Sequence, residues 1–178
     1  MLDSAACALG ALDGELIPAI RAQAEQFSSQ PTTTFIGGGR TSVDQSTFFN
    51  SVLVRYPDLL DTFLTPGGLC HPADNFGAVL AEHIDTTGAD FLLALAIAYE
   101  VQCRFSAQVP VMARGLNHAL QLAMSVAAGA SKLLGYDAAR TNATNSLSPA
   151  QKTSRRSITS RYENDRRDCG LALIRSSR

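Results

Sequence analysis

The sequence lacks the closely spaced cysteine pairs that mark zinc sites, iron–sulfur clusters and redox motifs. Its four cysteines stand singly along the chain, at Cys7, Cys70, Cys103 and Cys169. This spacing excludes the usual Cys-x-x-Cys arrangements. We therefore expect neither a metal nor a cofactor. Unpaired thiols are typical of proteins from reducing compartments, so the cysteines are expected to be reduced.

Long apolar runs and a secretory start are also missing. The longest apolar run, residues 91–99, is far too short to span a membrane, and Met1-Leu2-Asp3 has no basic lead-in. A net charge of −1 gives no general case for a nucleic-acid or membrane surface. We expect neither partner. With no targeting segment visible, the location stays open between the cytoplasm and the mitochondrial matrix.

The charge is distributed unevenly along the 178 residues. Residues 150–178 hold eight Lys/Arg and three Asp/Glu, a net charge of +5, so the preceding part carries −6. Residues 144–178 are rich in Ser and Arg and show no sustained period, which favours a disordered or loosely attached tail. A basic tail can bind nucleic acid or anionic lipid, but we favour a solvated segment. The predicted division is a domain over 1–143 and a tail over 144–178.

Most of the remaining chain has helical periodicity, and the predicted fold class is all-α with irregular loops. Ser42, Asp90 and Asp137 are predicted N-caps. Residues 91–99 are apolar on every face of the expected helix, which predicts a central buried helix. Proline and glycine favour an irregular loop over residues 55–71. Helices are expected over residues 2–12, 15–27, 43–54, 75–84, 91–99 and 116–134 and from 138, with a short β-like run at 32–36.

Acids and imidazoles occur at the predicted turns between these helices. Asp58 and Asp61 lie three residues apart, His71 follows ten residues later, and His118 comes near the start of the helix expected over residues 116–134. Proton transfer needs such groups, and a histidine before proline is held extended, so the backbone aims its ring. These four residues are therefore candidate catalytic acids and bases. The alternative is that the aspartates shape turns and the histidines are ordinary hydrogen-bonded side chains.

Three arginines are candidate substrate-binding residues. Arg55, Arg104 and Arg114 lie near the acidic and histidine segments. Guanidinium groups pair with carboxylates through two parallel hydrogen bonds, so they suit a di- or tricarboxylic acid. Surface salt bridging is the alternative for each of them.

The segment from Arg55 to Asn75 resembles the MmgE/PrpD family, which comprises 2-methylcitrate dehydratase and cis-aconitate decarboxylase relatives. Family members carry Arg-Tyr-Leu-Asp-Phe-Asn-Asp-Thr followed by His-Pro-Ser-Asp-Asn. Here the segments read Arg55-Tyr-Pro-Asp-Leu-Leu-Asp-Thr62 and His71-Pro-Ala-Asp-Asn75. Residues 94–104 and 128–135 resemble later family helices, and residues 114–118 between them resemble an Arg-Gly-Phe/Leu-Asp-His motif of the family. Departures include Pro57 for an aliphatic residue and Leu59-Leu60 for Phe-Asn.

The resemblance implies the N-terminal part of a helical domain from a hydro-lyase similar to 2-methylcitrate dehydratase, an enzyme of propionate metabolism. Such an enzyme acts on a small di- or tricarboxylate by general acid–base catalysis, without a metal, and the full-length family is expected to be homodimeric. The family site also uses a lysine and a second domain, so this chain alone is expected to be an inactive fragment. A cis-aconitate decarboxylase-like lyase and a non-catalytic helical interaction module remain the alternatives.

Overall fold

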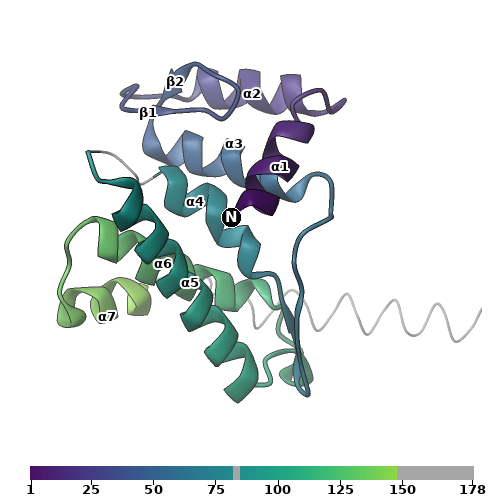
Figure 1. Ribbon diagram of the computed structural model, residues 1–178, viewed down its shortest axis with the longest axis vertical. Helices are drawn as coiled ribbons and strands as arrows, with labels where there is room; N and C mark the ends of the chain where they lie inside the picture. The colour runs from purple at the N-terminus through teal and green to yellow at the C-terminus, as the bar shows by residue number, and fades with distance from the viewer. Residues whose placement is uncertain (82–84, 148–178) are drawn as a thin grey trace, which may run out of the picture.

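A computed structural model describes residues 1–81 and 85–147. Seven α-helices dominate these residues, accompanied by two short 3-10 helices and two small antiparallel sheets (Figure 1). The elements are α1 (Leu2–Gly10), α2 (Ile17–Gln26), β1 (Thr33–Thr34), β2 (Arg40–Thr41), α3 (Val43–Arg55), β3 (Phe63–Thr65), β4 (Gly68–Cys70), η1 (Pro72–Asp74), α4 (Asn75–Ala81), α5 (Gly88–Gln108), η2 (Met112–Arg114), α6 (Ala119–Leu133) and α7 (Ala138–Leu147). The predicted mainly helical domain is confirmed.

The helices pack as two neighbouring groups that meet at α4. The first group packs α1, α2 and α4 against α3, and the second packs α5 against α6 with α7 beside it (Figure 1). Phe35 and Phe49 form an edge-to-face pair in the first group with ring centroids 4.8 Å apart. Phe76 of α4 meets Phe91 of α5 in the same manner at 5.9 Å, so one apolar core runs through both groups.

Small residues set how closely the central helices approach. A Cβ added to Gly77 would lie 2.5 Å from the backbone nitrogen of Ser51, so α4 rests directly on the α3 backbone. A Cβ at Gly129 would lie 3.0 Å from the Ala94 carbonyl oxygen, which gives a second close contact between α6 and α5. Gly129 therefore allows α6 to approach α5 closely at this point.

A buried polar cluster joins the start of α4 to α5 and α6. The Asn75 side-chain amide donates to the Pro72 carbonyl at 2.9 Å and to Gln102 Oε1 at 2.5 Å. Ser125 Oγ in turn donates to Asn75 Oδ1 at 2.7 Å. All three side chains are almost fully buried, so these bonds replace water for polar groups that would otherwise be costly to bury. The cluster holds the histidine turn against two helices.

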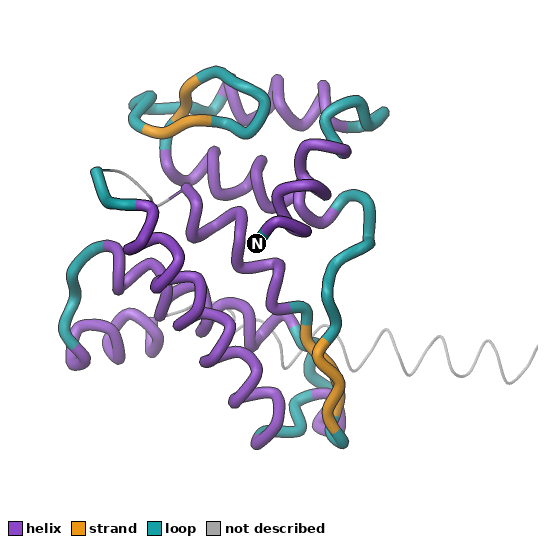
Figure 2. The backbone as a smooth tube through the Cα atoms, in the orientation of Figure 1, coloured by secondary structure: helices purple, strands orange, loops and turns teal. Residues whose placement is uncertain are grey.

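The prediction of an irregular loop over residues 55–71 was wrong for its second half. Strands β3 and β4 form an antiparallel hairpin in which Thr65 faces Gly68 (Figure 2). Proline and glycine occupy the two-residue turn between these residues, so they connect strands rather than prevent them. The hairpin lies beside α5, where Thr65 Oγ1 donates to the Ser106 carbonyl at 3.3 Å. Strand pairing and this tertiary contact outweigh the local turn signal.

Three helix predictions also need correction. The N-cap of α5 is Thr87, and Asp90 is the third residue of a capping box, because each side chain bonds the other's backbone nitrogen. Helix α5 is not buried on all sides, since Leu92 and Leu93 are about half exposed. Helix α6 begins at Ala119 rather than at residue 116. Asp137 does cap α7, because its Oδ1 accepts from the Arg140 nitrogen at 2.7 Å.

Two predictions concern regions that the structure covers in part. Helix α7 continues through residue 147, and residues 148–178 of the predicted tail lie outside the described residues. The helix predicted for residues 75–84 is described as far as Ala81. Within the described residues, no helix combines the length and the apolar character required of a membrane span.

Candidate acid–base site

His71 lies between the β3–β4 hairpin and η1, and the preceding loop fixes its ring. Its Nδ1 is 2.9 Å from the Asp61 carbonyl oxygen and 3.2 Å from Thr62 Oγ1. A carbonyl oxygen can only accept, so Nδ1 carries the proton in the neutral ring. The lone pair is consequently on Nε2, which neither of these bonds uses. Sequence reasoning identified His71 as a candidate acid or base, and its tautomer suits either role.

The Asp61 carboxylate is occupied in holding this turn together. Its Oδ1 accepts from the Ala73 nitrogen at 2.9 Å, and its charge acts on the Tyr99 phenol of α5. Burial, followed by the nearby Asp61 charge, raises the pKa of Tyr99 well above its ordinary value, so the phenol stays a donor. In this geometry Asp61 orients His71 through its backbone carbonyl and anchors the loop through its side chain.

His118 meets His71 at the beginning of α6. The two ring centroids are 5.4 Å apart with an interplanar angle of 73°. Burial lowers the pKa of His118, and the neighbouring His71 and Arg55 lower it further, against the opposing effect of Asp74. His118 is therefore neutral at neutral pH and available to accept a proton. Two residues 47 positions apart in sequence thus form one imidazole pair.

Asp74 is a site residue that the sequence reasoning did not select. Its side chain is only 15% exposed, and its Oδ1 lies 3.8 Å from Arg55 Nη1. Both of these atoms are buried without a hydrogen-bond partner, because the gap is too long for a direct bond. Burial raises the pKa of Asp74, although the charges of Arg55 and of His71 and His118 pull it down. The signal for it was its place three residues after His71, in the same motif.

Arg55, Asp74 and His118 open into one groove between α3 and α6. The groove has a volume of about 650 Å³. Apolar side chains form most of its wall, and the three ionisable groups interact electrostatically within it. It is lined by Thr47, Phe48, Ser51, Val52, Arg55, Tyr56, Asp74, His118, Ala119 and Leu122. This groove combines the guanidinium cation of Arg55 with the neutral imidazole of His118.

The other predicted residues lie outside this groove. Asp58 is 76% exposed and forms an ion pair with Arg55 at 3.1 Å. Arg104 is exposed on α5 and pairs with Glu100 one turn earlier in the same helix. Arg114 is exposed at the end of η2. Of the three predicted arginines, the structure brings Arg55 to the imidazole pair.

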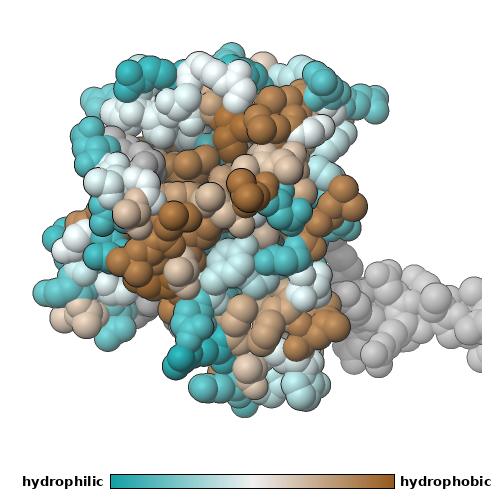
Figure 3. All heavy atoms as spheres, viewed as in Figure 1, coloured by the Kyte–Doolittle hydropathy of each residue, from teal (hydrophilic) through white to brown (hydrophobic). Residues whose placement is uncertain are grey.

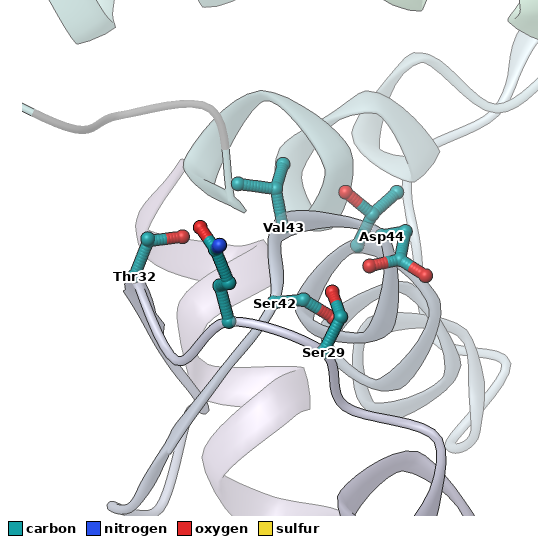
Figure 4. Close-up of a pocket in the computed structure, with 7 residues that line it drawn as sticks. Ser29, Thr32, Ser42, Val43 and Asp44 are labelled. Atoms are coloured by element: carbon teal, nitrogen blue, oxygen red, sulfur yellow. The ribbon is translucent and has the colours of Figure 1, made fainter.

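A second, polar groove surrounds the beginning of α3 (Figure 4). It is lined by hydroxyl and amide side chains together with Asp44. The neighbouring Ser42 and Gln45 side chains lower the pKa of Asp44, and Gln45 Nε2 donates to Asp44 Oδ2 at 2.9 Å, so this carboxylate is charged. The lining includes neither a histidine nor a basic side chain, so the α3–α6 groove is the better candidate for acid–base chemistry. Among the described residues, no group of three His, Cys, Asp or Glu side chains could hold a metal.

The lowered pKa of His118 predicts a pH dependence of stability. Protonation is less favourable in the folded chain than in the unfolded chain, so stability is lost as pH falls below the ordinary histidine value of 6.5 towards the folded-state pKa. In His118→Gln, the difference in unfolding midpoint between pH values of about 7.5 and 5.5 is expected to shrink. Urea unfolding of both proteins at the two pH values measures this; an unchanged difference would contradict the assignment.

The fold and this site together define a helical domain with an imidazole pair beside a groove lined by Arg55, Asp74 and His118. The family model described as "MmgE/PrpD N-terminal domain" matches residues 1–168. The chain belongs to the MmgE/PrpD family, which includes dehydratases and other lyases. A comparison with curated proteins found no match.

Proposed function

We propose that the α3–α6 groove binds a small di- or tricarboxylic acid and that the chain carries the acid–base part of a hydro-lyase site similar to that of 2-methylcitrate dehydratase. The observation that carries this proposal is the pairing of His71 with His118, whose ring centroids are 5.4 Å apart. This pair lies beside a groove that Arg55 lines. Family membership supports a lyase. The mostly apolar lining and the Arg55 cation suit a ligand with at least one carboxylate and some apolar surface.

Dehydration of a hydroxy acid removes a proton from the carbon next to a carboxylate and expels hydroxide as water. The base needs a free lone pair, which His71 Nε2 has because Nδ1 donates to the Asp61 carbonyl. Arg55 would stabilise the carboxylate that gains charge during proton removal. His118 is neutral, so it can take up a proton from solvent. It would then donate this proton to the leaving hydroxide, which departs as water. A decarboxylase of the same family would use the same groups to protonate carbon.

A second candidate function is a non-catalytic helical interaction module. Exposed apolar side chains on one face of the molecule favour it. Apolar side chains gather over the N-terminal half of α5 and around the N-terminus (Figure 3). Leu2 is 81% exposed and Leu9 60% exposed, and Leu92 and Leu93 add to this surface. Exposed apolar clusters of this kind mark protein interaction sites. A second copy of the chain is the proposed partner, as expected for a homodimeric family.

We expect Arg55→Gln to weaken binding of 2-methylcitrate or citrate by about ten- to a hundred-fold, because a charge-assisted contact to a carboxylate is lost. The matched control is Arg104→Gln, which removes a guanidinium from the exposed face of α5 and should leave affinity unchanged. Chemical shifts of the His71 and His118 rings, followed by NMR during titration, report binding. Equal affinities of the unmodified chain, Arg55→Gln and Arg104→Gln would show that Arg55 does not bind the carboxylate.

Turnover separates the two candidate functions. Loss of 2-methylcitrate and appearance of the double bond can be followed by ultraviolet absorbance. His71→Asn is the informative variant, because asparagine can still donate to the Asp61 carbonyl but has nothing at the Nε2 position. Turnover that disappears in His71→Asn supports the lyase. Turnover that this variant retains would show that His71 is not the base. Binding without turnover is the result expected of a chain that carries only the acid–base part of the site, and absence of both binding and turnover supports the interaction module.

A further inference from the structure

Arg55 and Asp74 face each other in the wall of the α3–α6 groove without closing a hydrogen bond. Arg55 ends α3 and Asp74 ends η1, and both side chains line the groove together with His118. Arg55 Nη1 and Asp74 Oδ1 are 3.8 Å apart, and each atom is buried without a hydrogen-bond partner. Buried polar atoms are normally paired, so the wall of this groove holds one unused donor and one unused acceptor.

Arg55 lies between two aspartates that differ in their surroundings. Asp58 Oδ1 is 3.1 Å from Arg55 Nη2, and the Asp58 side chain is 76% exposed, so water can satisfy it. The Asp74 side chain is only 15% exposed and stands among the mostly apolar residues of the groove. A carboxylate in such surroundings is costly to bury unless a donor reaches it. A donor group on a ligand in the groove would meet this need.

The charges of the pair favour a hydroxyl group as that donor. A ligand carboxylate can accept from the Arg55 guanidinium, but a second carboxylate directed at Asp74 would be repelled by its negative charge. An ammonium group could donate to Asp74, but the Arg55 cation is only 3.8 Å away and would repel it. A hydroxyl group is neutral and donates one hydrogen bond, so it meets neither repulsion. A 2-hydroxy acid carries this hydroxyl on the carbon atom that bears a carboxylate.

We propose that Asp74 is a specificity-determining residue of the groove and accepts a hydrogen bond from the hydroxyl of a 2-hydroxy acid whose carboxylate pairs with Arg55. This inference rests on the proposed function and adds to it the residue that recognises the leaving group. The hydroxyl would then lie beside His118, which lines the same groove. Because Asp74 takes the hydrogen of the hydroxyl, the oxygen keeps its lone pairs for the proton that His118 donates.

The test compares two ligands of the unmodified chain. Citrate and tricarballylate have the same carbon skeleton and the same three carboxylates, and only citrate carries a hydroxyl group. At about pH 8 the carboxyl groups of both acids are ionised. Citrate is expected to bind about ten-fold more tightly or better, because a hydrogen bond to a charged group is gained. Isothermal titration calorimetry measures the two dissociation constants.

Variants of the two aspartates show whether Asp74 produces this preference. In Asp74→Ala, the ratio of the two dissociation constants should fall to about one, while tricarballylate still binds. Asp74→Asn keeps the shape of the side chain and should lower the ratio in part, because a charge-assisted bond is about twice as strong as a neutral one. Asp58→Ala removes the exposed partner of the same guanidinium, so its ratio should equal that of the unmodified chain. A loss of structure would weaken both acids alike, and circular dichroism confirms that each variant is folded.

The outcomes separate this inference from the proposed function. Equal affinity of the unmodified chain for citrate and tricarballylate would overturn the role of Asp74 and leave carboxylate binding by Arg55 standing. An unchanged ratio in both folded Asp74 variants would overturn it as well. If neither acid binds, the proposed function and this inference fail together. Malate and aspartate differ in carrying a hydroxyl and an ammonium group, and tighter binding of aspartate would show that the groove selects an amine.

Discussion

Gly77→Ala is expected to lower the free energy of unfolding by about 3 kcal/mol or more, the upper part of the range for overpacked cores. The added Cβ would lie 2.5 Å from the Ser51 nitrogen and 2.7 Å from the Asn50 carbonyl carbon. Both neighbours are backbone atoms of α3, so no side-chain rotation relieves the contact. The helix itself must move, and α3 also carries Arg55 and one wall of the groove.

Two other glycines provide matched controls for this variant. Gly88 is the first residue of α5 and has open space where its Cβ would go, so Gly88→Ala should change stability by less than about 1 kcal/mol. Gly129→Ala should fall between the two, because its closest contacts are 3.0–3.2 Å. Urea unfolding of the three variants gives the order. A Gly77→Ala protein as stable as Gly88→Ala would show that α3 and α4 are not packed this closely.

Asn75→Ala is expected to destabilise the chain by about 3 kcal/mol, because the change leaves buried polar atoms without partners. Asn75 bonds with Pro72, Gln102 and Ser125, and Gln102 Nε2 is already unpaired. Each further orphaned group costs about 1–3 kcal/mol, and the truncated side chain leaves a cavity as well. The loss of the bond to the Pro72 carbonyl should also loosen the turn that follows His71.

The comparison for Asn75→Ala is Asn117→Ala. Asn117 is exposed and its side chain makes one bond, to the Ala119 nitrogen at 2.8 Å, so its removal should cost about 1 kcal/mol. Urea unfolding measures both losses, and NMR of the His71 ring reports the turn. Equal losses for the two asparagines would mean that the buried cluster adds nothing beyond a surface cap. An unchanged His71 signal in Asn75→Ala would show that the turn is held by Asp61 alone.

The helices were predictable because their apolar residues repeat with the helical period, and because Asp137 and the glycine after α6 mark ends locally. The hairpin at β3–β4 was missed for a physical reason. Its strands have three residues each, too few to show an alternating pattern, and they are held by the Thr65 contact with α5. The exposure of Leu92 and Leu93 could not be inferred either, since an apolar sequence does not say which neighbours cover it.

For the site, the sequence was sufficient to select the residue types. Two imidazoles and nearby acids at turns indicated proton chemistry, and the structure brings His71 and His118 into contact. The sequence could not distinguish Asp58, which is exposed, from Asp74, which is buried beside Arg55. It also gave no reason to separate Arg55 from Arg104. Burial depends on which helices pack together, and both acids occur in equally suitable motifs.

By itself, then, the chain's order of residues determined its helical class, most helix positions and the family to which it belongs, because these depend on local periodicity and on motifs short enough to read directly. The tertiary structure decided which charged groups share a groove and how closely the helices approach one another. Those outcomes follow from packing between segments 19 to 63 residues apart, where a glycine such as Gly77 sets the distance between helices. No local pattern encodes that distance.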